Sequence, residues 1–448
     1  MLKLASSSRR RIAVYTGHLL KKNFASANVT GNPLLKTHTL PPFKLIRVDH
    51  IEPAMEVLLS KYEKSIDGLE EQIDNKSVAG WNVFNELELI EQPVEDAWGV
   101  VSHLQGVKNS DDLRKAHEKV LPNVIKAMTK SSQSVSIYKA LELIKEDTNQ
   151  WNKLSKAQQR IVDQNLTAMR NQGVNLEGDQ QQRFNEIKME LADLSTKFSN
   201  NVLDATKEWS LIITDSSEIE GFPTSLKALT AQQAGSNDIE KGPWKLTLDY
   251  PVLGPVLQHA RIYMANVTKA GEVNAPIIAK ILSLRKEKAN LLNYNCHADL
   301  SLETKMAGNT DNVDELVEQL RNKAYPCALK EYKKLTKFAN LYGHKGKLEP
   351  WDTTFFSERQ REKLFEFTQE ELRPYFSLPD VLTGLFTLCE KLFNVHIMEV
   401  SNNDGNNTND SVQTWHEDVS FFHVLSKDNA NEHIASFYLD PYSRPEEK

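Results

Sequence analysis

The sequence has few cysteines and no long apolar run. Its 448 residues include only Cys296, Cys327 and Cys389, which lie far apart and form no C-x-x-C pair. This spacing suggests neither a disulfide framework nor a thiolate metal site. No apolar run approaches the ~20 residues that a helix needs to span a bilayer. We therefore expect neither a disulfide-stabilised secreted domain nor a membrane-spanning protein.

The body of the chain also lacks a basic stripe. The net charge is -7, with 26 % charged and 40 % hydrophobic residues, which is ordinary for a soluble globular protein of more than one domain. Nucleic-acid binding needs clustered Lys and Arg to neutralise phosphates. Nucleic acid is therefore not expected as the main partner.

Acidic residues are missing from the first 48 positions, where serines accompany many basic residues. Such a basic, acid-free leader is typical of organellar import signals, and no secretory apolar core is present because Lys21 and Lys22 directly follow Leu19-Leu20. We therefore interpret residues 1–48 as an organellar transit segment, mitochondrial before plastid. The alternative is a disordered basic tail on a cytoplasmic protein. The basic residues are Lys3, Arg9, Arg10, Arg11, Lys21, Lys22, Lys36, Lys44 and Arg47.

From Asp49 onward, apolar residues recur at helical spacing. The longest stripe follows Gly178 and runs from Phe184 to Trp209, and it favours core packing over a coiled-coil partner surface because its heptad spacing slips. Capping boxes are predicted at Asp49/Glu52, Asp179/Gln182 and Ser357/Gln360. Other helices are expected at about 51–73, 83–91, 98–104, 113–121 with a break or kink at Pro122, 135–143, 274–292, 311–324, 326–342, 357–367 and 381–393.

Strand-like stretches interrupt this helical pattern at two places. Residues 211–214 and 244–248 lie among glycines and prolines, which indicates a domain boundary near residue 240. Residues 419–425 and 434–439 predict a β-hairpin after a polar loop at 401–411. An isolated hairpin is marginal in water. We therefore expect further elements to cover it and interpret the sequence as cut off within a fold.

Residues that could form a catalytic site are few. A zincin needs two histidines four positions apart on one helix face, with a glutamate after the first as general base. His117-Glu118 and His416-Glu417 both fail to complete this motif, and the other histidines are scattered singly. No G-x-S-x-G or Gly-rich phosphate loop is present either. The residues alone therefore predict no catalytic and no metal-ligating set.

A series of longer motifs nevertheless follows the leader. The motifs are FSNNVLDATK at 198–207, GPW at 242–244, ILSLRKEKA at 281–289, LLNY at 291–294, ADLSL at 298–302, KMA at 305–307, WD at 351–352, LRPYFSL at 372–378, Val381 with GLF at 384–386, WH at 415–416 with DV at 418–419, and FYLDPYSRP at 437–445. In this order they resemble the thimet oligopeptidase and oligopeptidase A family of zinc metallopeptidases, and the organellar oligopeptidases most of all. The resemblance covers nearly everything after the leader, although the stretch from Tyr263 to Pro276 is shorter than in the family.

The resemblance implies a mainly α, two-domain, clam-like fold with a deep channel that admits short unstructured peptides. We expect a helical domain at 49–240 and the front part of the catalytic domain at 241–448, with a small β-hairpin at its end. The complete family enzyme uses one zinc ion, whose ligands lie beyond the position matching Arg444-Pro445. None of those ligands can be assigned here, so no catalytic or metal residue is predicted.

The resemblance also suggests a function for the complete protein. We expect a monomeric zinc metalloendopeptidase that hydrolyses short peptides, such as cleaved targeting peptides, and we expect the lone 448-residue chain to be inactive. The alternatives are a non-catalytic peptide-binding or regulatory scaffold, and a product that does not fold stably. Six residues are predicted near the substrate cleft, with support for the underlying sheet as the other interpretation: Trp351, His416, Tyr438, Asp440, Tyr442 and Arg444.

Overall fold

The computed structural model describes residues 31–220, 222–256, 260–367, 369–400, 412–429, 432–442 and 444. Residues 1–30 of the predicted leader and the predicted loop at 401–411 lie outside these ranges. Within them the chain is mainly α, as predicted. No described helix is long and apolar enough to cross a membrane.

The first part of the chain consists of helices that bury one face each. Side chains of Ser110, Ser134 and Ser155 cap three of these helices by accepting hydrogen bonds from backbone N–H groups of the first turn. The bounds are η1 Pro33–Leu35, η2 Phe43–Leu45, α2 Val48–Asp74, α3 Asn82–Val107, α4 Asp111–Ser132, α5 Val135–Glu146, α6 Thr148–Trp151, α7 Lys156–Asn171 and α8 Gly178–Glu208.

The second part alternates helices with short strands. β1 and β2 form one antiparallel pair, and β3, β4 and β5 form a three-stranded antiparallel sheet in that order. The bounds are β1 Ser210–Ile213, η3 Ser216–Ile219, α9 Thr224–Gln233, β2 Trp244–Thr247, α10 Tyr250–Val256, α11 Ala260–Thr268, α12 Gly271–Leu291, α13 His297–Leu302, α14 Thr310–Leu341, α15 Pro350–Phe365, α16 Gln369–Leu372, η4 Arg373–Phe376, α17 Leu378–Phe393, β3 Val395–Glu399, β4 Ser420–Ser426 and β5 His433–Leu439.

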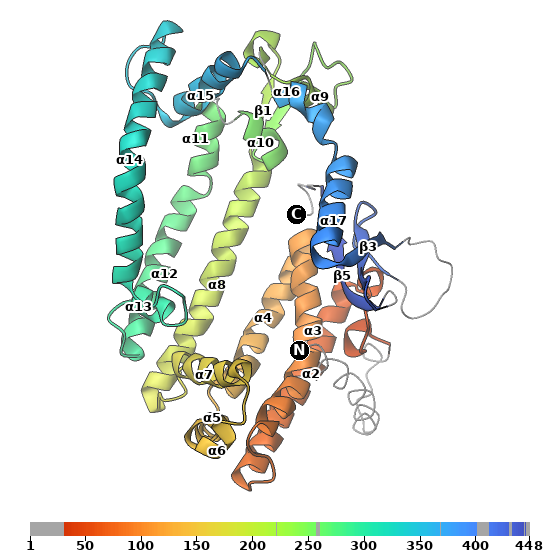
Figure 1. The fold of residues 1–448 in the computed structure, drawn as a ribbon, viewed down its shortest axis with the longest axis vertical. Helices are drawn as coiled ribbons and strands as arrows, with labels where there is room; N and C mark the ends of the chain where they lie inside the picture. The colour runs from red at the N-terminus through yellow and green to blue at the C-terminus, as the bar shows by residue number, and fades with distance from the viewer. Residues whose placement is uncertain are drawn as a thin grey trace.

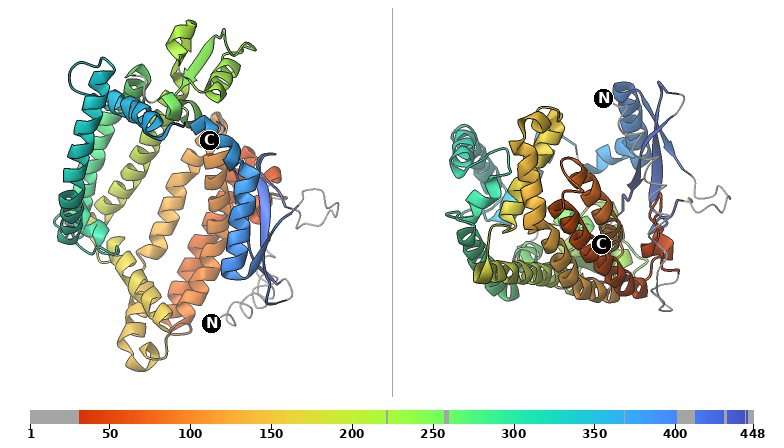
Figure 2. Two further views of the ribbon diagram at one scale, coloured as in Figure 1. Left: turned by 45° about the horizontal axis from the view of Figure 1, so that its top comes forward. Right: turned by 90° about the horizontal axis from the view of Figure 1, so that it is seen from below.

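Two groups of helices stand on opposite sides of the molecule (Figure 1). One side contains α8, α11, α12 and α14, and the other contains α2, α3, α4 and α17. The groups approach each other near α5 and α7, and at the other end α15 and α16 lead across to α17 (Figure 1). The three-stranded sheet lies against α17 on the outer flank of the second group (Figure 2).

The predicted apolar face of α2 is buried. Ile51, Met55 and Tyr62 are at most 2 % exposed and belong to a core shared with α3 and α4. Full burial of side chains of this size contributes roughly 1.5 to 3 kcal/mol each. The Tyr62 hydroxyl donates a 2.6 Å hydrogen bond to Ser131 Oγ of α4, which satisfies its polar group. The stripe of α8 is fully buried only at Phe184 and Ile187.

The structure corrects several predicted helix boundaries. α4 continues through Pro122 and α14 through Pro326, so Pro122 does not break a helix and the two helices predicted at 311–342 are one. In α4 the residues on either side of the proline, Val120 and Val124, are buried, and this packing outweighs the hydrogen bond that proline removes. Similarly, the helices predicted at 83–91 and 98–104 are the single helix α3, which contains Pro93.

All three predicted capping boxes are wrong because the helices begin earlier than expected. α2 begins at Val48, and the backbone N–H of Arg47 before it donates a 3.3 Å hydrogen bond to His50 Nδ1. α15 begins at Pro350 and its box is Glu349 with Asp352, while α8 has no side-chain cap. The predicted hairpin is confirmed as β4 and β5, but β3 was not predicted and pairs with the other edge of β4. β3 is short and follows α17 after a single residue, Asn394, whose left-handed backbone (φ 52°) ends the helix.

Glu91 is a half-buried carboxyl group on α3, and its burial, with a smaller effect of Glu95, raises its pKa to about 7. The folded state therefore favours the neutral carboxyl group. The contribution of Glu91 to the free energy of unfolding is complete below pH 4.5 and is lost as the pH rises through about 7. We expect Glu91→Gln to raise the free energy of unfolding by about 1 to 2 kcal/mol at pH 8, after allowance for solvent screening, and to change it little at pH 4.5. Urea unfolding at both pH values tests this. Glu88→Gln, at an exposed position of α3, is the control, and an equal effect of Glu91→Gln at both pH values would contradict the explanation.

Candidate functional site

Three of the six predicted cleft residues lie together where the C-terminal sheet meets the first helices. Asp440 accepts hydrogen bonds from both terminal nitrogens of Arg444, at 2.8 and 2.6 Å, and from Trp415 Nε1 at 2.9 Å. The side chains of Asp440 and Arg444 are only 10 % and 11 % exposed. Tyr438 packs beside them, with its ring centroid 5.2 Å from that of Trp415. We call Trp415, Tyr438, Asp440 and Arg444 the C-terminal cluster.

The C-terminal cluster packs against residues that precede it by more than 300 positions. The ring of Phe43, in η2, lies 5.1 Å from that of Trp415 and 5.7 Å from that of Tyr438, both edge to face. The imidazole of His103, in α3, lies 4.4 Å from the Trp415 ring. The cluster therefore connects the sheet to the core of the first helices.

The contact is buried enough to shift the pKa values of two of its polar groups. Burial lowers the pKa of His103, and the nearby Asp440 carboxylate opposes this shift. Burial also raises the pKa of Tyr438 to about 12. His103 Nε2 and the Tyr438 hydroxyl have no hydrogen-bond partner among the described residues. A neutral imidazole and a neutral phenol are therefore expected at this contact.

The other three predicted cleft residues lie apart from this cluster. His416 Nδ1 accepts a 3.2 Å hydrogen bond from the backbone N–H of Asp418, in the turn before β4. The Tyr442 side chain is exposed. Trp351 is in α15, where its ring lies 5.7 Å from that of Tyr263 in α11. The six residues thus do not form one site, and the cleft assignment stays a prediction.

A groove between α4 and α8 is a candidate site for binding a ligand. It has a volume of about 850 Å³, within the range of ligand sites. Leu121, Pro122 and Ile125 of α4 face Met189 and Ala192 of α8 across it. Acidic and amide groups surround these apolar residues: Glu118, Gln182, Asn185, Glu186, Glu190 and Asp193, with Thr196 and Lys197.

The acids around the groove are already paired. Glu190 lies 3.1 Å from Lys280, and Asp193 lies 2.7 Å from Lys197. Glu118 accepts a hydrogen bond from Asn200 at 2.6 Å. The groove can therefore offer apolar contacts flanked by hydrogen-bonding groups, which suits a peptide segment better than a small charged molecule. The sequence did not reveal it, because the pairing of α4 with α8 has no local signal.

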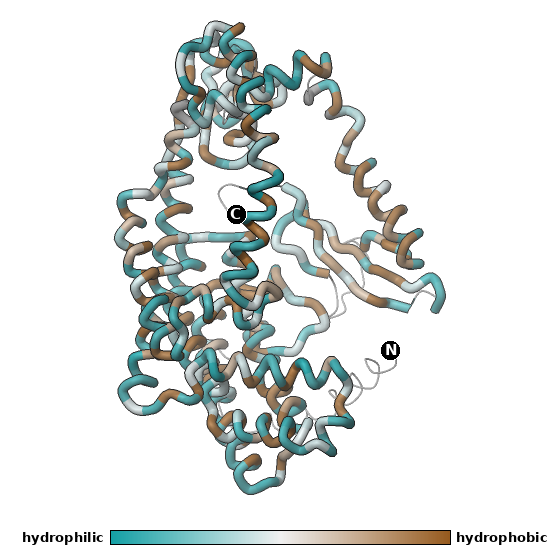
Figure 3. Tube along the Cα trace, turned by 60° about the vertical axis from the view of Figure 1, so that its left-hand side comes forward, coloured by the Kyte–Doolittle hydropathy of each residue, from teal (hydrophilic) through white to brown (hydrophobic). Residues whose placement is uncertain are grey.

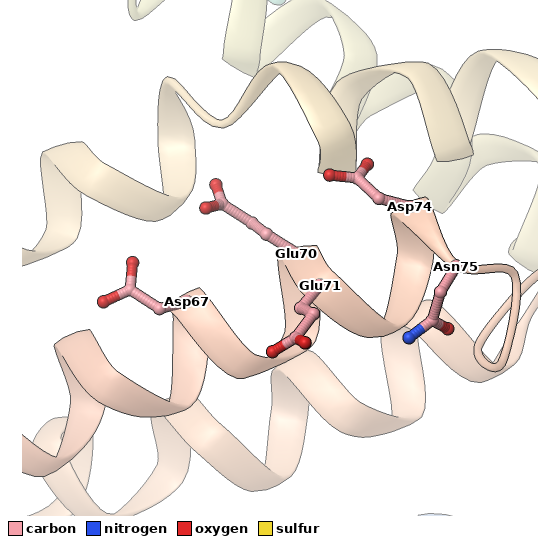
Figure 4. Close-up of a pocket in the computed structure, with 5 residues that line it drawn as sticks. All are labelled: Asp67, Glu70, Glu71, Asp74 and Asn75. Atoms are coloured by element: carbon pink, nitrogen blue, oxygen red, sulfur yellow. The ribbon is translucent and has the colours of Figure 1, made fainter.

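A second hollow, of about 580 Å³, lies at the end of α2. Asp67, Glu70, Glu71 and Asp74 extend from successive turns there, beside Asn75 (Figure 4). Asp67 forms an ion pair with Lys130 of α4. All the residues that line this hollow come from one helix end, so it is best described as a solvated acidic face.

The described residues do not fit a catalytic zinc ion. His117 is buried in a stack on Trp98, with the ring centroids 4.4 Å apart, and burial lowers its pKa. His416 is engaged with the backbone of its own turn, as described above. Within the described ranges, no group of three or more His, Cys, Asp or Glu residues lies close enough to hold a metal.

Comparison with known proteins gives this architecture a family. The family model "Neurolysin/Thimet oligopeptidase, N-terminal domain" matches residues 55–181, and the model "Peptidase family M3" matches residues 258–448. The organellar oligopeptidase A, chloroplastic/mitochondrial, of Arabidopsis thaliana is 40 % identical over 438 residues, covering 94 % of this chain and 53 % of the relative. The probable cytosolic oligopeptidase A of Arabidopsis thaliana has the same identity, with 94 % and 60 % covered.

Bacterial relatives agree with the plant ones. Oligopeptidase A of Escherichia coli is 33 % identical over 429 residues, covering 92 % of this chain and 61 % of the relative. The chain thus spans about three fifths of the length of most of the curated relatives it matches. Both family models match in the order in which the two predicted parts occur, and each matches a helical region of the structure. Residues 55–181 and 258–448 therefore match the thimet oligopeptidase N-terminal and M3 peptidase family models, and the chain is related to the oligopeptidases A.

Proposed function

We propose that this chain is the front part of a zinc-dependent oligopeptidase whose complete form hydrolyses short peptides, such as cleaved targeting peptides. The observation that carries the proposal is the ordered match to both M3 family models, together with 33–40 % identity to oligopeptidases A over more than nine tenths of the chain. The α4/α8 groove supports it by offering an apolar floor and polar edges to a peptide. Zinc belongs to the complete enzyme in this proposal.

We further propose that the 448 residues alone hold no catalytic zinc and hydrolyse no peptide. The sequence contains no H-E-x-x-H, and its two His-Glu pairs are used elsewhere. His117 stacks on Trp98, and His416 accepts a hydrogen bond from its own turn. We also propose a monomer, because the C-terminal cluster packs against the first helices of the same chain.

The proposed compartment is the mitochondrion, with plastid and cytoplasm as alternatives. The basic, acid-free leader and the organellar relative support it, while the cytosolic relative supports the alternative. Leu34 and Phe43 are buried in the core with α2. A removable transit segment would therefore end before Leu34, earlier than the boundary at residue 48 that the sequence suggested.

A non-catalytic peptide-binding scaffold is the second candidate function. It is favoured by one observation, the presence of a groove in a chain whose described residues do not fit zinc. Peptide binding by the 448 residues, without hydrolysis when zinc is supplied, would support it.

Cleavage of a quenched fluorescent peptide by the purified 448-residue chain tests these proposals, with zinc quantified in the same sample. We expect no turnover and well under one tenth of a zinc ion per chain. Escherichia coli oligopeptidase A, assayed in parallel, is expected to cleave the peptide in a chelator-sensitive way. Chelator-sensitive turnover by the 448 residues, with one zinc bound, would show that the scattered histidines do form a site. Fluorescence anisotropy of an uncleaved peptide separates binding from hydrolysis.

A further inference from the structure

The chain exposes far more surface than a compact protein of its mass. Its accessible surface is 29678 Å² at 51.0 kDa, whereas a compact monomer of this mass exposes roughly 17,000 Å². Counting all residues outside the described ranges as fully exposed, at about 1.45 Å² per dalton, still leaves an excess of roughly 5,000 Å². Much of the surplus surface therefore belongs to described helices.

α17 presents an apolar stripe that nothing in the described chain covers. Leu378, Val381, Leu385, Leu388 and Leu392 follow one another by three and four positions, and are 40 % to 67 % exposed. Apolar residues recur along this helix, which runs down to the strands on the right of Figure 3. Such spacing places the five side chains on one face of the helix.

The other side of α17 is the one that holds it to the sheet. The Phe386 ring lies 5.1 Å from that of Phe422 in β4. Glu390 accepts a hydrogen bond from the backbone N–H of Ile397 in β3 at 3.0 Å and lies 3.1 Å from Lys427. The exposed stripe therefore lies on the side of α17 that faces away from the sheet. α17 itself is firmly attached to the sheet through its other side.

α14 has the same feature on a larger scale. Every residue from 314 to 334 is exposed, and burial begins only at Leu335 and Ala339 near its end. Leu316, Val317 and Leu320 are 55 % to 60 % exposed on adjacent turns. Helices in proteins are stabilised chiefly by packing of an apolar face, which this long segment lacks within the described chain.

We propose that the exposed faces of α14 and α17 bind the part of an oligopeptidase A polypeptide that has no counterpart in these 448 residues. The proposal rests on the proposed function. Both helices lie inside the region that matches the M3 family model, and about two fifths of the length of most relatives is unmatched. An intimate, permanent interface buries 2,000–5,000 Å² or more when both partners are counted, so the surplus of roughly 5,000 Å² on this chain alone is ample for one. The three-four spacing on α17 suits a helical partner.

Co-expression of the full 448-residue chain with this segment of the Arabidopsis organellar oligopeptidase A tests the inference. We expect the two polypeptides to purify as a one-to-one complex, with slower hydrogen exchange in α14 and α17 than in the chain alone. The double variant Leu385→Glu/Leu388→Glu places two charges on the stripe and is expected to weaken association at least tenfold. Thr387→Glu adds a charge to the same helix off the stripe and is the matched control, with no expected change.

The outcomes separate this inference from the proposed function. A complex without peptidase activity would support the interface and count against the catalytic proposal. The inference would be overturned if no complex forms although the chain alone is folded and monomeric. Sedimentation shows the monomer, and slow hydrogen exchange in β4 shows that it is folded. Sedimentation of the chain alone as a dimer that Leu385→Glu dissociates would also overturn it, in favour of a second copy as occupant.

Discussion

Trp415→Ala is expected to lower the free energy of unfolding by about 3 to 5 kcal/mol. The Trp415 side chain is 5 % exposed and touches the rings of Phe43, His103 and Tyr438, so its removal leaves a cavity between the sheet and the first helices. It also removes the 2.9 Å hydrogen bond to Asp440. Urea unfolding gives the magnitude, and hydrogen exchange in β4 and β5 shows whether the loss is located at this contact.

Two variants separate the ring from its polar group. Trp415→Phe keeps an aromatic ring and removes the indole N–H, and we expect it to cost about 1 to 2 kcal/mol. Trp351→Ala makes the same truncation in α15, where one aromatic neighbour, Tyr263, is in contact, and we expect the smaller loss there. Equal losses of unfolding free energy for Trp415→Ala and Trp351→Ala would mean that the contact of Trp415 with the first helices contributes no more than an ordinary aromatic contact.

The helices that were predicted best are those with a complete apolar period. The α2 face from Ile51 to Leu69 is buried as the spacing indicated, because a stripe at 3.6-residue spacing must be covered. The predicted helix ends at Pro122 and Pro326 are wrong. Proline lowers local helix propensity, but tertiary packing decides whether the helix continues.

The candidate site was only partly predictable. Family motifs identified Tyr438, Asp440 and Arg444, which the structure brings together, but not Phe43 or His103, which complete their surroundings. These contacts join positions more than 300 residues apart and leave no periodic pattern. The same holds for the α4/α8 groove, whose lining comes from two helices predicted separately. The domain boundary near residue 240 stays a prediction.

Asp440→Ala is expected to lower the free energy of unfolding by about 3 to 5 kcal/mol, because it leaves the Arg444 charge in a nearly buried position. Asp440→Asn keeps the shape and one acceptor oxygen, so we expect a smaller loss. The double variant Asp440→Ala/Arg444→Met removes both charges and is expected to recover at least half of the loss, since apolar replacement of a buried ion pair is often neutral.

A double-mutant cycle with urea unfolding decides whether the Asp440–Arg444 pair is a unit. If the pair acts as one unit, the losses of Asp440→Ala and Arg444→Met will not add, and the coupling energy will exceed about 1.5 kcal/mol. Additive losses would mean that each residue acts through other neighbours and that the two hydrogen bonds of 2.8 and 2.6 Å contribute little. The pair lies just after β5, in the motif FYLDPYSRP, so strong coupling would give that family motif a structural reason: it fixes the end of the sheet against Trp415 and thereby against the first helices.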